Sequence, residues 1–87
     1  MSDIREILNE RGERYGTFMS RSVISQGLKR VMFTADRKLE DDQAEALEMI
    51  ANKIARILNG DPDYADSWTD IAGYATLVAE RLNGRQL

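Results

Sequence analysis

The sequence predicts an all-α fold, a small helical bundle of about four helices that is completed by oligomerisation. Apolar residues recur at intervals of three and four, and no stretch shows the strict alternation of a β-strand. The chain has 87 residues and no cysteine, so its core is small and has no disulfide to reinforce it. Self-association is the remaining common way to stabilise so short a chain.

The first two helices are expected over residues 4–14 and 19–33. Asp3 and Glu6 have the spacing of a capping box, which places the first helix start directly after Asp3. The second segment repeats apolar residues at helical spacing. Gly27 lies in its middle and predicts a close crossing by another helix, because glycine otherwise weakens a helix interior.

The third helix has the strongest signals. Asp42 and Glu45 have capping-box spacing, a continuous apolar stripe follows, and Gly60 stands where a glycine commonly ends a helix. The fourth helix is expected to begin near Ser67, with Asp70 completing a weaker capping box. These four segments account for most of the chain.

We expect one domain over residues 1–87, with a helical pair at 3–33 and a helical hairpin at 41–84. Charge divides unevenly along it: residues 1–38 carry net +3 and residues 39–87 carry net −6. The acidic half argues against duplex nucleic acid as a partner. The two charges are either solvated surfaces, or the basic half docks an anion or an acidic neighbour such as a second copy.

Composition limits the chemistry that the chain can perform. Without histidine or cysteine it has no imidazole base, no thiolate nucleophile and no structural zinc site. A hard cation such as Mg²⁺ on oxygen ligands is the metal that this composition suits. The charged N-terminus and the lack of a long apolar run predict a cytoplasmic protein with no signal peptide and no membrane partner.

The last two helices each carry a second stripe opposite the apolar one, at spacings of four, three and four. Apolar residues and a glycine within these stripes indicate helices that are contacted on two sides, as in a homodimer or homotetramer. The alternative is ordinary surface with two stray apolar residues. The residues predicted to lie in an interface between copies are Met49, Asn52, Gly73 and Leu77.

Acidic residues are paired on the same two helices. Glu45 and Glu48 are three residues apart, and Asp66 and Asp70 are four apart, so each pair shares a helix edge. If the two pairs converge, they could hold one or two Mg²⁺ ions for a phosphate-bearing ligand. The alternative is that these acids only cap helices and favour the helix dipole. The residues predicted to meet a phosphate are Lys53 and Arg56.

Most of the chain resembles a family of small uncharacterised proteins of tailed phages and prophages. The resemblance covers residues 7–82 and includes the stretches 24–29, 45–50, 53–60 and 66–75. It implies a phage origin, hence the cytoplasm of an infected bacterium, and it brings no established activity.

A more distant resemblance is to the all-α nucleoside triphosphate pyrophosphohydrolases of the MazG and dimeric dUTPase type. The Glu-x-x-Glu of Glu45 and Glu48, followed by Asp70 at an acidic helix start, carries it. The resemblance implies Mg²⁺ on these three residues and assembly as dimers or tetramers. The second motif of those enzymes has an acid where this chain has Ser67; either Asp66 substitutes for it, or the scaffold has lost its metal.

Three functions are therefore open. The first is a Mg²⁺-dependent nucleotide-binding protein or pyrophosphohydrolase. The second is a non-enzymatic phage protein that binds a host protein or sequesters a signalling nucleotide, as an anti-defence or host-takeover factor. The third is a structural or accessory phage protein.

Overall fold

The computed structural model describes residues 3–85, and this part of the chain forms four α-helices and no strand. The helices are α1 (Ile4–Tyr15), α2 (Phe18–Met32), α3 (Asp41–Asn59) and α4 (Ala65–Leu82). The all-α prediction is confirmed; three boundaries of the first two helices are displaced by one residue, and both later helices start earlier than predicted. None of the helices in the described part is long and apolar enough to cross a membrane.

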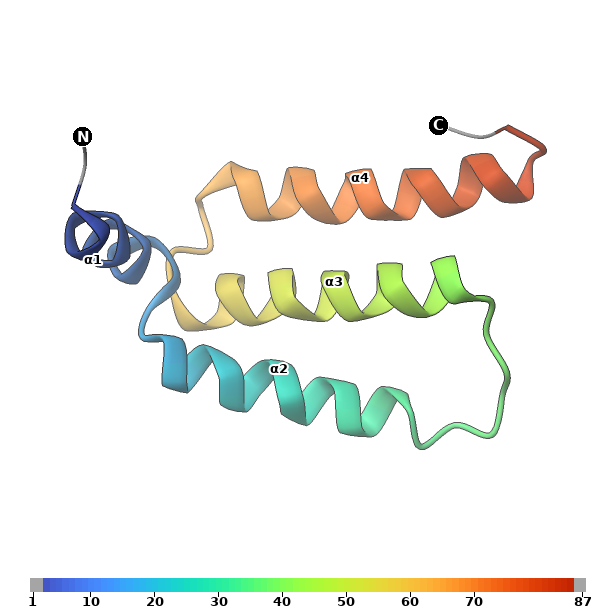
Figure 1. Cartoon of the computed structure of the whole chain (residues 1–87), viewed down its shortest axis with the longest axis horizontal. Helices are drawn as coiled ribbons and strands as arrows, with labels where there is room; N and C mark the ends of the chain where they lie inside the picture. Colours follow the sequence, from blue (N-terminus) through green and yellow to red (C-terminus); the bar gives the residue numbers. More distant parts are fainter. Residues whose placement is uncertain (1–2, 86–87) are drawn as a thin grey trace.

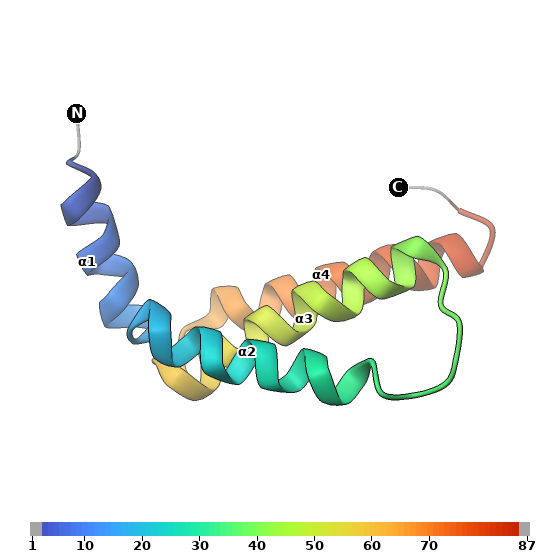
Figure 2. The same cartoon turned by 60° about the horizontal axis from the view of Figure 1, so that its bottom comes forward.

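Three of the helices form a single layer. Figure 1 shows α2, α3 and α4 side by side with α3 in the middle, and Figure 2 shows α1 leaving the layer at one end. Helix α3 packs against both α2 and α4, whereas α2 and α4 have no contact with each other. Helix α1 contains no buried residue. The layer therefore leaves two broad faces without a covering helix.

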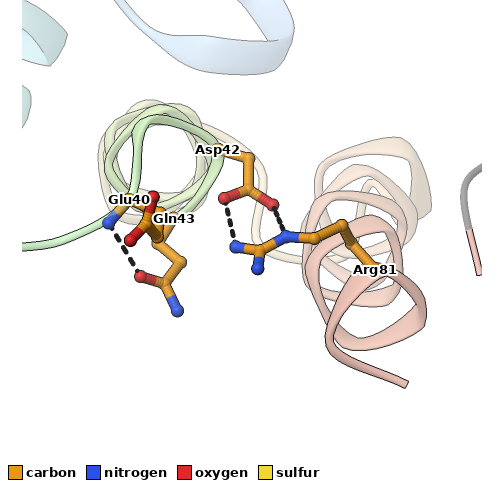
Figure 3. Close-up of polar contacts among 4 residues, drawn as sticks. All are labelled: Glu40, Asp42, Gln43 and Arg81. Carbon is orange, nitrogen blue, oxygen red and sulfur yellow. Dashed lines mark hydrogen bonds and ion pairs between the residues drawn. The ribbon is translucent and has the colours of Figure 1, made fainter. Parts of the chain in front are cut away.

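The third helix begins one residue earlier than its predicted cap. Its N-cap is Glu40, whose backbone N–H donates to the Gln43 side chain at 2.9 Å, while the Glu40 side chain accepts from the Gln43 backbone (Figure 3). The predicted box of Asp42 with Glu45 is wrong because Asp42 is inside the helix. Its carboxylate instead accepts two hydrogen bonds from Arg81 of α4, one of them 2.8 Å long.

The fourth helix begins at Ala65, with Tyr64 as N-cap, so the predicted cap at Ser67 is also wrong. Ser67 lies within the first turn and is buried against the layer. Asp70 does not close a capping box; its carboxylate pairs with Lys53 of α3 at 3.2 Å. The spacing of Ser67 and Asp70 was thus misread as a capping box, because both side chains pack between helices instead.

A tight corner joins the two halves of the chain. The Asn59 side-chain amide donates to the backbone oxygens of Tyr15 and Thr17, and the Asp61 N–H donates to the Arg14 oxygen at 2.7 Å. A side chain at Gly60 would overlap the backbone of the α1 end. Gly60 ends α3 as predicted, but its φ of −134° is not left-handed, so glycine is needed there for the close approach of the α1 end and not for a turn.

Helix α3 has two buried flanks and two open faces. Ala51 and Ala55 are fully buried on one flank, and Ala46, Lys53 and Ile57 are buried on the opposite one. At about 100° per residue, the two predicted stripes of α3 fall between these flanks, on the two open faces of the layer. The helix is contacted on two sides by α2 and α4 of its own chain, and these sides are the flanks rather than the two stripes that were predicted to be contacted.

The two open faces differ in composition. The apolar face, as we name it, comprises the residues Ile24, Leu28, Val31, Leu47, Ile50, Ile54, Leu58, Trp68, Ile71, Ala75 and Leu82. The opposite polar face comprises Arg21, Ser22, Gln26, Glu45, Met49, Asn52, Arg56, Asp70, Gly73 and Leu77. Helical spacing assigns the residues to their faces, relative to those that contact the neighbouring helix, except for Arg21, which belongs to the polar face because its side chain lines the pocket there.

Candidate functional site

The polar face contains a pocket between α2 and α3 with a volume of about 240 Å³. Its α2 side is mostly polar, and its α3 side consists of Met49, Asn52 and Arg56 from the predicted second stripe, together with Lys53. The lining residues are Phe18, Arg21, Ser22, Ser25, Gln26, Met49, Asn52, Lys53 and Arg56. Three of these nine side chains are cationic and none is a carboxylate, so the pocket has a positive charge.

Two of the three cations have no acidic partner. Among residues 3–85, neither Arg21 nor Arg56 forms an ion pair. Lys53 is buried and forms an ion pair with Asp70 of α4, whose side chain is about half exposed. The guanidinium groups of Arg21 and Arg56 are therefore the uncompensated charges of the pocket.

The same aromatic ring holds both guanidinium groups near each other. The Arg56 group lies 4.5 Å from the centre of the Tyr15 ring, and the Arg21 group lies 5.6 Å from it. Partial burial lowers the pKa of Arg21 below its ordinary value, and the positive charge of Arg56 lowers it further. Two like charges are thus held together at a cost that a bound anion would offset.

Neutral donors surround these charges. The Ser25 hydroxyl, which is buried, donates to the Asn52 side-chain oxygen at 2.6 Å and fixes the orientation of that amide. The Asn52 amide nitrogen then has only the sulfur of Met49 as an acceptor, at 3.8 Å. Because a thioether is a weak acceptor, this N–H can donate to a ligand in the pocket.

The predicted phosphate-binding residues are brought together, since Lys53 and Arg56 line this one pocket. The four predicted metal ligands are not. Among residues 3–85, no three His, Cys, Asp or Glu side chains come close enough to hold a metal ion. Glu45 and Glu48 lie at the start of α3, whereas Asp66 and Asp70 lie at the start of α4, and the two helices run in opposite directions.

Antiparallel packing explains the separation of these acids. Asp70 lies opposite Lys53, two turns of α3 and about 12 Å along the axis from Glu45. Glu45 instead lines a second, more apolar pocket of about 360 Å³ beside Arg81. Asp66 accepts a hydrogen bond from the Tyr64 hydroxyl at 2.9 Å. The four donors therefore do not fit a metal site within one chain.

The residues predicted to form an interface divide into two pairs. Met49 and Asn52 line the pocket against α2, so their neighbours belong to the same chain. Gly73 and Leu77 are exposed on α4, and a side chain at Gly73 would meet no atom within 4 Å. The close crossing predicted at Gly27 is wrong, because the nearest atom there is the end of the Arg30 side chain at 3.9 Å.

The contribution of α2 to the pocket was not predicted. Arg21, Ser22, Ser25 and Gln26 follow at spacings of one, three and one, which places polar groups along one side of an otherwise apolar helix. That pattern was visible in the sequence. What it faces depends on the packing of α2 on α3, which helical spacing alone does not give.

Comparison with known protein families places the chain in one of them. Residues 1–82 match the family model DUF6378, described as a domain of unknown function, and the chain belongs to this family. Neither a curated protein nor a solved structure matches it.

Proposed function

We propose that this protein binds a phosphate-bearing ligand, a nucleoside di- or triphosphate, in the pocket between α2 and α3. The observation that carries the proposal is the pair Arg21 and Arg56, two guanidinium groups without acidic partners that are held beside one ring. A guanidinium group is planar and matches phosphate oxygens in bidentate geometry.

The size of the pocket suggests how such a ligand would lie. A volume of about 240 Å³ is smaller than the roughly 300–1,000 Å³ of sites that enclose a whole drug-sized ligand. The phosphates would occupy the pocket, and the base would lie at its rim. Phe18, which lines the rim and is 74% exposed, offers a face on which a base can stack.

Binding is favoured over hydrolysis because the pocket lining has no carboxylate to act as a base or to hold a metal. Hydrolysis with Mg²⁺ on Glu45, Glu48, Asp66 and Asp70 stays a prediction, and it would need ligands from more than one chain. Including Mg²⁺ in the binding experiment separates the two functions, since only the second predicts product formation.

Self-association is the second part of the proposal. The chain exposes 6639 Å² of accessible surface, about 1,400 Å² more than the roughly 5,200 Å² expected for a folded chain of its mass. Its radius of gyration is 14.9 Å, against about 12 Å for a compact domain of this length. A homo-oligomer would cover this excess, which is a favourable exchange because much of it is apolar.

Isothermal titration calorimetry tests the ligand proposal. The protein is titrated with inorganic pyrophosphate and with nucleoside mono-, di- and triphosphates, each with and without Mg²⁺. We expect binding that strengthens with the number of phosphates. Arg56→Gln should weaken it about 10- to 100-fold, the equivalent of one charge-assisted hydrogen bond or a bidentate pair.

Arg30→Gln is the matched control, because it removes the same charge from an exposed position of α2 outside the pocket. It should change the dissociation constant less than about twofold at 0.15 M salt, where separated surface charges are screened. Equal losses of affinity in both variants would show that the phosphate compounds are held only by unspecific attraction to positive charge. No binding of any phosphate compound would refute the proposal.

A further inference from the structure

On the side of the layer opposite the pocket, no segment among residues 3–85 covers the apolar face. Leu47 is 40% exposed, Leu58 67% and Trp68 55%, and Val31 and Leu82 are exposed as well. The indole N–H of Trp68 donates to the Pro62 oxygen at 2.8 Å, so its polar group is satisfied and its ring is left for apolar contact. All three helices of the layer contribute to this surface.

We infer that the apolar face is the contact surface for a second copy of this chain, with the two layers packed face to face. The inference rests on the proposed self-association and specifies its surface. The excess accessible surface of about 1,400 Å² exceeds the roughly 800 Å² that each partner buries in a stable complex of standard size. This excess is summed over the whole chain, and the apolar face, to which all three helices of the layer contribute exposed apolar side chains, is the surface on which a second copy would cover it.

Charge fixes which helices meet. Helix α2 carries Arg21, Lys29 and Arg30 and no acidic residue, and α4 carries three acids against Arg81. Stacking α2 on α2 would bring two basic helices together. A twofold axis along α3 instead lays the basic helix α2 of each copy over the acidic helix α4 of the other, a pairing that attraction between the two helices favours.

This arrangement places α3 over α3 of the second copy, in the same direction, with equivalent residues adjacent. Leu47 of one copy then lies next to Leu47 of the other. Glu45, only two residues away, faces outward on the polar face of each copy. The pocket residues Arg21 and Arg56 stay open to solvent in the dimer, which keeps ligand binding and dimer formation on separate surfaces.

Disulfide trapping tests the surface, because the chain has no cysteine of its own. Leu47→Cys and its matched control Glu45→Cys both replace exposed residues of α3, so neither should disturb the fold. Circular dichroism of both variants checks this. Under mild oxidation we expect a covalent dimer from Leu47→Cys and little from Glu45→Cys. The reverse result would overturn the choice of face.

Two further measurements complete the test. A short bis-maleimide applied to a mixture of Val31→Cys and Ala75→Cys chains should link one to the other, as α2 over α4 requires; a failure to link them would overturn the orientation. Sedimentation equilibrium of the unmodified protein should give twice the mass of one chain. A single-chain mass up to 100 µM would refute self-association itself, while the calorimetric result on phosphate ligands would stand apart from it.

Discussion

The two faces of the three-helix layer are built from the same helices and differ in what they leave unsatisfied. The polar face gathers guanidinium groups without acidic partners and an amide N–H with only a sulfur acceptor. The apolar face leaves large apolar side chains in water. The first deficit is met by an anion and the second by an apolar surface, so one thin layer can serve a ligand and a partner at once.

The largest effect on stability is expected at Gly60, where the end of α3 packs against the end of α1. Gly60→Ala would force a side chain into the backbone of Arg14 and Tyr15, and we expect a loss of about 3 kcal/mol in the free energy of unfolding. Because Tyr15 holds both pocket arginines, the variant should also lose ligand affinity. Gly12→Ala is the control; nothing lies within 4 Å there, and urea unfolding should show no loss.

A charge on the apolar face should break the dimer. Leu47→Asp removes a leucine whose burial between copies is worth about 1.5–3 kcal/mol, so the melting temperature should fall by roughly 10 °C or more. Glu45→Ala, on the same helix but the other face, should stay within about 0.5 kcal/mol of the original protein. An unchanged mass and melting temperature in Leu47→Asp would show that this face is exposed to solvent in the native state.

Two glycines sharpen the assignment of surfaces. A Cβ at Gly73 meets no atom within 4 Å, and a Cβ at Gly27 meets only the end of the Arg30 side chain at 3.9 Å, so alanine at either position should raise stability by about 0.5–1 kcal/mol through helix propensity. Thermal unfolding at several protein concentrations measures it. Destabilisation by Gly73→Ala would instead indicate that a second copy packs against Gly73, as the sequence predicted, and would move an interface to the polar face.

The smallest effect is a pH dependence at the far end of the α3–α4 hairpin. Hydrogen bonds from Arg81 hold the pKa of Asp42 below its ordinary value of 3.8. A carboxyl with a lowered pKa in the folded state stabilises the fold above pH 3.8, and that stability is lost as the pH falls through the lowered pKa. Asp42→Asn should therefore lower the urea midpoint at pH 7 and converge with the original protein near pH 2.

Helix content was predictable from the sequence, and contacts between helices were not. The apolar spacing of α3 identified the helix, yet the predicted N-cap, Asp42, is two residues from the true one, because Glu40 is a residue type that rarely caps helices. Lys53 and Arg56, which were predicted to meet a phosphate, do line one pocket, because a spacing of three residues keeps them near one side of a helix. That reasoning holds within a helix, where the geometry is fixed.

Between helices the same reasoning fails, because helical spacing does not say how one helix is aligned along another. The pairing of Glu45 and Glu48 with Asp66 and Asp70 required two helix starts to meet, and an antiparallel hairpin separates them. Gly60 illustrates a related limit. It was assigned to the end of α3 from its position alone, whereas the chain that approaches it comes from residues more than forty positions earlier.

The most direct test of the account is to map a bound phosphate ligand on the protein by NMR. Backbone amide shifts of the uniformly ¹⁵N-labelled chain are recorded while a nucleoside triphosphate is added. We predict that the largest changes fall on α2 and α3 around Arg21, Ser25, Asn52 and Arg56, with the apolar-face residues unchanged. Changes centred on the α3–α4 pocket beside Glu45, or no changes at all, would contradict the assignment of the polar face as the ligand site.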